Sequence, residues 1–310
     1  MGYKPELLAT AGSLEEVTKI IDAGADAVTI GESTYGMRLP GDFTIEEIRE
    51  VAKRAHEREA KVYVVVNNIM SNDLLAGLPD YLKQVEQAGA DALVFGDPAV
   101  LIAMRQAGVN LPLHWNAEMT STNYVTANYW GTKGATRVVL ARELNLEQVL
   151  EIKRKAEVEV QVQVHGITNI YHSKRELVAN YRNHLGRKAE GETYSPEQGL
   201  FLIEAERRDE RYPIYEDRNG THIMSSEDLC MLENLHELME GGIDSFKIEG
   251  LLKTPEYNEA VVKAYRRVID AYTADPEHYE FQDEWLEAVE RVQPGNRPLS
   301  YGFFYKEQVY

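Results

Sequence analysis

Short apolar runs that alternate with helical patterns are the feature that most constrains this chain. Eight runs are rich in β-branched or other apolar residues, and each is followed by a helical pattern or by a loop leading to one. They span residues 6–9, 27–30, 61–66, 92–95, 111–116, 137–141, 158–164 and 245–248. Because strand and helix alternate, the pattern predicts an α/β fold with a parallel sheet. The count of eight favours closure of that sheet into a β/α (TIM-like) barrel.

Recurring signals mark where the helices between these runs begin and end. Ser13 and Thr44 are each followed three residues later by Glu, which is the capping-box pattern of a helix start. Residues 225–228 (Ser-Ser-Glu-Asp) predict a third start of the same kind. Glycines that end a helix in the left-handed conformation are expected at Gly24, Gly89, Gly134 and Gly242.

The spacing of the runs also predicts the domain organisation. Residues 1–275 are expected to form the barrel, and the interval between the last two runs is too long for a plain β/α loop. An insertion before the last strand is therefore expected at about residues 166–224, on the face where strand C-terminal ends build active sites. Residues 276–310 are expected to form a C-terminal extension packed on the barrel.

The composition excludes several classes of protein. A single cysteine, Cys230, leaves no intramolecular disulfide, zinc ribbon or self-contained cysteine-ligated iron–sulfur cluster, and predicts a reducing compartment. The formal charge of −18 disfavours nonspecific binding of nucleic acid. There is neither an apolar leader nor an apolar run of about 18 residues. These features predict a soluble, cytoplasmic protein without membrane contact.

One basic segment departs from the acidic average. Residues 171–188 contain five cations and a single acidic residue, Glu176; the cations are Lys174, Arg175, Arg182, Arg187 and Lys188. Two interpretations remain open at this point. The segment is either a solvated helix and loop, or a patch that faces the phosphates of a nucleic acid.

Polar residues follow the predicted strands, where a barrel enzyme carries its chemistry. They are Thr10, Glu32, Asn67, Asn68, Asp97, Asn116, Glu118, Arg142, Glu143, His165, Lys247 and Glu249. On the fifth strand, the two-residue period places His114, Asn116 and Glu118 on one face. An imidazole, an amide and a carboxylate can bind a polar substrate or a metal, although a satisfied polar layer inside the barrel is an equally simple interpretation.

Several common motifs are missing from the sequence. There is no His-Glu-x-x-His helix and no Gly-x-Ser-x-Gly elbow, so the standard protease signatures are absent, although a triad assembled in space remains open. No Gly-x-Gly-x-x-Gly or Walker pattern follows any strand. A dinucleotide cofactor and nucleotide hydrolysis are therefore disfavoured.

One stretch resembles a known family signature. Residues 164–177 read Val-His-Gly-Ile-Thr-Asn-Ile-Tyr-His-Ser-Lys-Arg-Glu-Leu and are similar to the signature of the collagenase-like peptidases, peptidase family U32. Five further segments resemble that family, and the resemblance extends from about residue 5 to 265; the segments are residues 5–8, 23–27, 138–144, 228–230 and 247–250.

The resemblance implies two different activities. The family is named for a proposed metal-dependent collagenase activity. Other members are similar to proteins that hydroxylate RNA or quinone precursors without oxygen, including those that form 5-hydroxyuridine at the tRNA wobble position with prephenate as a source. Those members generally carry a cysteine-bound four-iron four-sulfur cluster.

The sequence departs from the family pattern at its cysteines. The two signature cysteines fall on Asn169 and Glu176, and only Cys230 remains, which we expect to be a helix residue and neither a ligand nor a nucleophile. Leu251 stands where the family would place an arginine. The pattern resembles the shorter member of a pair found in some Gram-positive bacteria, whose longer paralogue bears the cysteines. This resemblance implies that the chain is a partner subunit of such a paralogue and binds no cofactor alone. An iron–sulfur cluster would be present only in the paralogue, and tRNA would be bound through the complex.

Three hypotheses follow: a subunit for tRNA hydroxylation, a metal-dependent peptidase, and a non-catalytic ligand-binding barrel. For the first, Glu118 and His165 are the catalytic candidates, and the substrate-binding candidates are Arg142, Asn116, His114 and Glu249. The planar fork of Arg142 suits carboxylates such as those of prephenate. The nucleic-acid contacts would be Lys174, Arg175 and Arg182. A peptidase would need a metal held by some of His114, Glu118 and His165, to activate water.

Overall fold

All eight expected runs form strands in the computed structural model, which describes residues 3–118, 120–187 and 192–307. They are β1 (Glu6–Thr10), β2 (Ala27–Ile30), β3 (Lys61–Val66), β4 (Ala92–Phe95), β5 (Leu113–Trp115), β6 (Ala135–Val139), β7 (Glu159–Ser173) and β11 (Ser245–Glu249). Each strand pairs in parallel with the next, and β11 pairs with both β7 and β1. The sheet is therefore a closed β/α barrel of the TIM type, as predicted.

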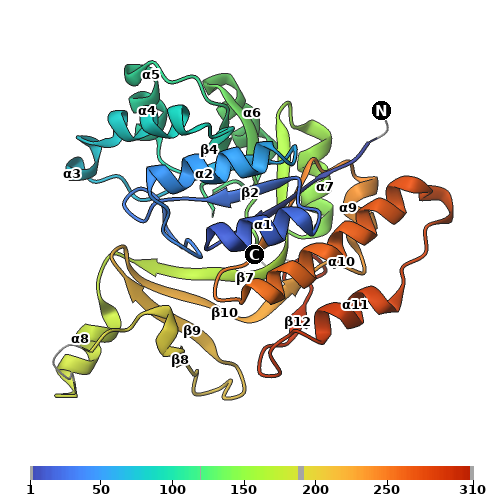
Figure 1. Ribbon diagram of the computed structural model, residues 1–310. Helices are drawn as coiled ribbons and strands as arrows, with labels where there is room; N and C mark the ends of the chain where they lie inside the picture. Colours follow the sequence, from blue (N-terminus) through green and yellow to red (C-terminus); the bar gives the residue numbers. More distant parts are fainter. Residues whose placement is uncertain (1–2, 119, 188–191, 308–310) are drawn as a thin grey trace.

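Helices surround the barrel and connect its strands (Figure 1). They are α1 (Leu14–Asp22), α2 (Ile45–His56), α3 (Asn72–Leu75), α4 (Leu78–Ala88), α5 (Pro98–Ala107), α6 (Tyr124–Lys133), α7 (Leu146–Lys155), α9 (Leu235–Glu240) and α10 (Pro255–Ala274). The Thr44 capping box forms with Glu47, and the hydroxyl of Ser13 accepts the backbone N–H of Glu16. The four predicted helix-ending glycines all have positive φ. Of the helices in the described ranges, none combines the length and apolar character needed to cross a bilayer.

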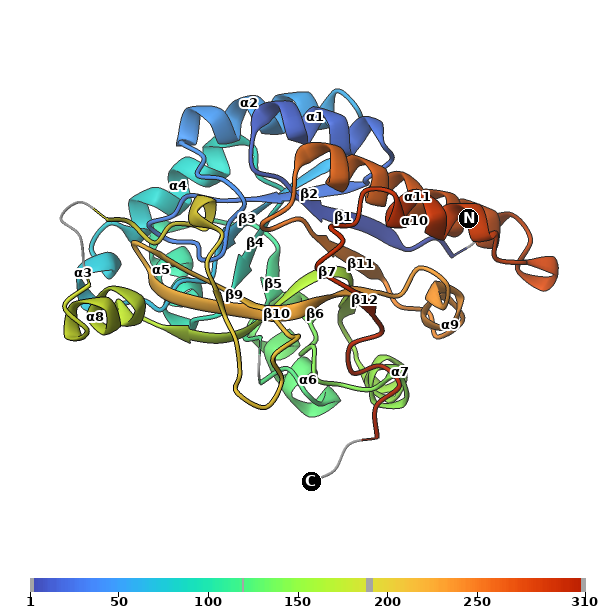
Figure 2. The ribbon, with the colours of Figure 1, turned by 90° about the horizontal axis from the view of Figure 1, so that it is seen from below.

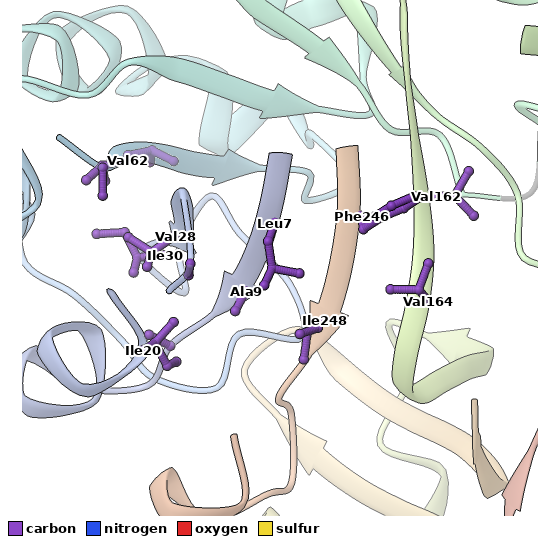
Figure 3. Packing of buried hydrophobic residues seen from close by; sticks show 14 of the residues in the cluster. Leu7, Ala9, Ile20, Val28, Ile30, Val62, Val162, Val164, Phe246 and Ile248 are labelled. Carbon is purple, nitrogen blue, oxygen red and sulfur yellow. The ribbon is translucent and has the colours of Figure 1, made fainter. Parts of the chain in front are cut away.

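The apolar core has two layers. The larger layer lies between strands and helices and includes Leu7 of β1, Phe246 of β11 and Ile20 of α1 (Figure 3). A smaller cluster faces the barrel axis and includes Leu8, Tyr63, Val65 and Val94, among others. Leu7 and Leu8 belong to different layers because successive side chains of a strand point to opposite faces.

The interval between β7 and β11 forms a second sheet beside the barrel opening. Strand β7 continues to Ser173 and pairs antiparallel with β10 (Gly220–Cys230), which pairs with β9 (Tyr212–Asp217) and, through it, with β8 (Phe201–Leu202). We call residues 167–173 of β7 together with β8, β9 and β10 the lid sheet; α8 (Leu177–His184) and the 3-10 turn η1 (Pro196–Gln198) connect its strands. Figure 2 shows β10 crossing in front of the barrel strands.

Gly166 lies where β7 leaves the barrel. Its φ is +97°, and a Cβ there would stand 2.0 Å from the carbonyl oxygen of Glu249, so only glycine fits. The C-terminal residues contain η2 (Pro276–His278), α11 (Asp283–Glu290) and β12 (Leu299–Ser300). Because β12 pairs with β10 and α11 packs on α10, this segment joins the lid sheet to the barrel helices.

Two sequence-based predictions were wrong in this part of the chain. Residues 225–228 do not start a helix but lie within β10, where the Ser225 hydroxyl donates to the carbonyl of Glu227. Cys230 is consequently the last residue of a strand and not a helix residue. Asp228 is fully buried and bound by Lys253 and Arg297, so it serves an ion-pair network and not a helix N-terminus.

Candidate functional site

The mouth of the barrel, which we define as the opening at the C-terminal ends of its strands, holds a small polar cavity of about 50 Å³. Residues of β1, β2, β3, β4, β7 and β11 line it, together with residues that directly follow β5. Its charged lining consists of Arg38, Glu118, Arg142, Lys247 and Glu249. Its uncharged polar lining consists of Thr10, Thr29, Asn67, Asn116, Gln161, Gln163 and Asn169.

Glu118 lies between two arginines in the mouth. Its carboxylate accepts a hydrogen bond from Arg38 Nη2, and Oε1 lies 3.6 Å from Arg142 Nη2. Burial raises the pKa of the Glu118 carboxyl, but Arg38 and Arg142 outweigh burial and bring that pKa below its usual value. Glu118 is therefore ionised at neutral pH and holds both guanidinium groups at the cavity.

A second ion pair lies on the other side of the mouth. Lys247 Nζ is 2.8 Å from Glu249 Oε2, and the Thr10 hydroxyl donates to Glu249 Oε1 over 3.0 Å. Counting the described lining, three cations oppose two carboxylates, which leaves one positive charge. The mouth is thus locally positive in a chain whose formal charge is −18. An anionic small ligand is the kind that this surplus favours.

Two features of the mouth are typical of a ligand-binding site. Arg38 and Glu118 have φ of +54° and +55°, so both members of one ion pair occupy the left-handed region that non-glycine residues rarely adopt. Such strain persists where the surroundings hold it and clusters at ligand sites. The hydroxyl of Thr29 is buried in the cavity wall and has no hydrogen-bond partner among the described residues.

The structure brings four of the predicted site residues together in this cavity: Asn116, Glu118, Arg142 and Glu249. Sequence reasoning missed Arg38, because it lies in the loop after β2 and not on a strand. The available signal was its place in a loop on the C-terminal face of the barrel, where such loops carry function.

His114 shares the inward face of β5 with Asn116, as predicted, but lies deeper in the barrel. Its ring packs edge-on against Tyr63 at 4.6 Å, and it pairs across the sheet with Arg137. Burial, followed by the nearby charges of Arg137 and Lys61, holds the pKa of His114 well below its usual value. His114 is therefore a neutral residue of the barrel interior and does not line the mouth.

His165 points away from the mouth. A register shift places Gln163 opposite Lys247 but His165 opposite the outward-facing Ile248, so the simple alternation fails here. His165 Nε2 lies 2.8 Å from the hydroxyl of Tyr257, and burial lowers its pKa to about 3. The expectation that His165 joins Glu118 in one site is therefore wrong in geometry.

These positions also exclude the predicted metal ligand set. The three residues lie in different places: His114 is in the barrel interior, Glu118 is in the mouth, and His165 is on the outer side of β7. Within residues 3–118, 120–187 and 192–307, no group of three or more His, Cys, Asp or Glu side chains is arranged to hold a metal ion.

The chain's residues do not fit a cysteine-bound cluster either. Cys230 is buried opposite His165 in the β7–β10 ladder, whereas Asn169 pairs with Met224 and lines the mouth. Glu176 is exposed just before α8. One thiolate cannot replace the several that such a cluster requires, and the other two positions offer none.

The basic segment does not act as one uniform patch. Lys174 Nζ donates to the carbonyl of Ile69 over 2.8 Å, and Arg175 is exposed. Arg182 on α8 is paired with Glu192 at 2.9 Å, which neutralises its charge. Lys188 lies outside the described residues. Lys174 and Arg175 are thus the better placed of the three predicted nucleic-acid contacts.

Comparison with known proteins gives a consistent result. The sequence profile of peptidase family U32 matches residues 12–309. The chain is 50% identical to tRNA hydroxylation protein P2 of Bacillus subtilis over 99% of both chains. It is 36% identical to tRNA hydroxylation protein P1 of the same organism, over 99% of this chain and 74% of that one. The solved structure of the U32 peptidase Mk0906 matches with a TM-score of 0.51 at 17% identity, over 80% of this chain and 94% of that one.

Proposed function

The chain belongs to peptidase family U32, and from this membership we propose that it acts in tRNA hydroxylation. The observation that carries the proposal is the 50% identity to a tRNA hydroxylation protein over 99% of both chains. A match over the full length of both chains includes the barrel, the lid sheet and the C-terminal segment together. The proposed role therefore concerns the whole chain and not one shared module.

In its specific form, the proposed reaction is prephenate-dependent formation of 5-hydroxyuridine at the tRNA wobble position. The surplus positive charge of the mouth supports binding of a carboxylate group of an acidic co-substrate there. We assign Arg142 to a substrate carboxylate, because its planar fork can donate two parallel hydrogen bonds to one. Asn116 and Glu249 would orient the polar remainder of that ligand. Glu118 would hold Arg38 and Arg142 in position, with its carboxylate ionised.

The proposed partner is a cysteine-bearing paralogue of the same family. Bacillus subtilis has both the P2 and the P1 protein, and this chain covers only 74% of P1, so P1 has additional length. A partner of that kind would supply any iron–sulfur cluster, since this chain holds one cysteine. It would also need to bring basic surface for tRNA, beside Lys174 and Arg175, because this chain is strongly acidic.

The peptidase alternative gains no support from the site. It required a metal bound by His114, Glu118 and His165, and these residues lie in three different places. The non-catalytic alternative predicts that loss of the chain leaves tRNA chemistry unchanged.

A deletion strain tests the proposal. Nucleoside mass spectrometry of tRNA should show loss of 5-hydroxyuridine derivatives at the wobble position, restored by the intact chain on a plasmid. Co-purification from the complemented strain should recover the longer paralogue with the tagged chain. Unchanged wobble nucleosides in a strain that also lacks every other route to them would contradict the proposed function.

A further inference from the structure

A second cleft lies beside the mouth and is far larger than the mouth cavity. It encloses about 630 Å³, whereas the mouth cavity encloses about 50 Å³. Small-molecule and nucleotide sites generally occupy a few hundred Å³ or more, so the larger space has the size of a ligand site. The two spaces adjoin, because Leu39, Pro40, Ile167 and Leu251 line both.

Two segments of the chain give this cleft apolar lining. Leu200, Phe201 and Ile214 come from the β8–β9 region of the lid sheet, and Leu251 and Leu252 come from the loop after β11. Phe201 is 44% exposed and Leu252 is 37% exposed, so large apolar surfaces are open to solvent. Exposed aromatic and apolar side chains in a cleft suit a planar ring, as in the sites that hold unstacked bases of RNA.

Cations border these apolar walls. The guanidinium of Arg211 lies 4.9 Å from the centre of the Phe201 ring, and both residues line the cleft. Lys253 and Arg297 also line it and share the single carboxylate of Asp228. Glu16 and Glu197 line the cleft too, so its three cations are balanced by three carboxylates, counting Asp228. A nucleotide carries a planar base and a phosphate, and Phe201 and Arg211 offer a partner for each.

Tyr215 provides a second, independent indication of a ligand site. It lines the cleft, is 3% exposed, and its hydroxyl has no hydrogen-bond partner among the described residues. Tyr215 also packs with Ile167, Met224 and Leu251, the residues that separate cleft and mouth. A buried hydroxyl without a partner costs stability, and a polar edge of a bound base would satisfy it.

The backbone of Leu252 is consistent with a ligand wall. Its φ of +62° is in the left-handed region, where a leucine is strained. Glycine would relieve this strain, yet a leucine places its side chain against the cleft. Strain of this kind is typical of ligand clamps.

We infer that the cleft between the lid sheet and the loop after β11 binds a single unstacked pyrimidine nucleotide, with the base against Phe201 and Leu252 and the phosphate near Arg211. The inference rests on the proposed function, in which the substrate is a uridine in tRNA. Chemistry on a base inside a stacked strand generally requires that the base be turned out into a pocket. A base in this cleft would lie next to the charged groups of the mouth.

The test uses the full chain and uridine 5′-monophosphate as the probe. Calorimetric titration should show binding of the nucleotide at millimolar or lower concentration, and much weaker binding of ribose 5-phosphate, which lacks the base. Phe201→Ala should weaken nucleotide binding about tenfold or more, because stacking of a base on an aromatic side chain is lost. Leu202→Ala is the matched control, since Leu202 is also 44% exposed and adjacent but does not line the cleft.

Leu252→Gly separates binding from folding. The variant should be at least as stable as the wild type in thermal unfolding, because strain is relieved, while its affinity for the nucleotide falls. Absence of nucleotide binding, equal binding of ribose 5-phosphate, or unchanged affinity in both Phe201→Ala and Leu252→Gly would overturn the inference. Those results would leave the deletion-strain experiment untouched. The chain could bind the nucleotide although its deletion leaves tRNA unchanged. That pair of results would contradict the proposed function but support the cleft as a nucleotide site.

Discussion

The two ends of the barrel each contain a buried arginine–glutamate pair, but the pairs are built differently. At the N-terminal end, which we call the floor, Arg137 of β6 contacts Glu6 of β1, and Tyr63 and Ser245 also donate to the Glu6 carboxylate over 2.6 and 2.9 Å. All four residues lie on regular strands. At the mouth, Arg38 and Glu118 lie outside the strands, both at positive φ.

The difference separates stability from function. The Arg137–Glu6 pair of the floor makes its hydrogen bonds to residues of neighbouring strands, whereas the mouth has a polar cavity, a surplus cation and an unpartnered hydroxyl at Thr29. Side chains at the bottom of such barrels generally stabilise the fold, and those at the top carry chemistry. Variants at the floor should therefore change unfolding, and variants at the mouth should change tRNA modification.

Arg137→Ala should produce the largest loss of stability. It removes the guanidinium from a side chain that is only 5% exposed and leaves Glu6 buried without its counter-charge. Breaking a buried pair in this way costs about 3–5 kcal/mol. Urea denaturation followed by circular dichroism measures the change, and the double variant Arg137→Met with Glu6→Gln should recover part of it. A loss below about 1 kcal/mol would show that the floor does not hold the barrel together.

Arg142→Ala should have the opposite profile. Glu118 keeps Arg38 as its partner, so the free energy of unfolding should change by about 1 kcal/mol or less. Wobble hydroxylation in the complemented deletion strain should fall about tenfold or more, because a charge-assisted contact to the anionic substrate is lost. Arg142→Lys keeps the charge without the planar fork and should retain an intermediate level. Full modification by Arg142→Ala would show that Arg142 does not bind the substrate.

The stability difference between wild type and Glu6→Gln should depend on pH. Burial raises the pKa of Glu6, but Arg137 and the hydrogen bonds to the carboxylate outweigh burial and lower that pKa below 4.5. A lowered pKa stabilises the fold above the unfolded value of 4.5, and this contribution is lost as pH falls through the folded value. The difference should therefore be largest at neutral pH and shrink below about pH 4.5. Denaturation series at several pH values measure it, and a constant difference would contradict the ion pair.

His114→Gln should have the smallest effect on modification. His114 packs beside Tyr63 and Arg137 and does not line the mouth, so substrate binding should not involve it. Wobble hydroxylation per amount of soluble protein should stay within about twofold of the wild type, because dividing by soluble protein corrects for any loss of stability caused by a substitution at this buried position. A tenfold loss of wobble hydroxylation would show that His114 takes part in substrate binding.

The sequence predicted the parts of the fold that depend on local pattern. The eight strand runs are rich in β-branched or other apolar residues and are punctuated by capping residues and glycines, and each formed its strand because these signals agree with one another. Residues 225–228 show where such reasoning fails. Their Ser-Ser-Glu-Asp pattern fits a helix start, but pairing of β10 with β7 and the ion pairs of Asp228 outweigh the local preference.

The candidate site was predictable only in part, for geometric reasons. Asn116, Glu118, Arg142 and Glu249 follow strands directly, and strand ends converge at the mouth. Alternation from the inward-facing Gln163 would also turn His165 inward, but one register shift turned its side chain toward α10. Arg38 comes from a long loop whose path no periodicity describes, so its contact with Glu118, 80 residues away, required the structure.

The measurement that tests the account most directly compares the mouth with the barrel interior in one strain. The deletion strain would express wild type, Arg142→Ala or His114→Gln, with wobble nucleosides measured by mass spectrometry and divided by the amount of soluble chain. The account predicts that Arg142→Ala loses most hydroxylation at a normal protein level, whereas His114→Gln retains it. Full hydroxylation by Arg142→Ala together with loss in His114→Gln would contradict the assignment of function to the mouth.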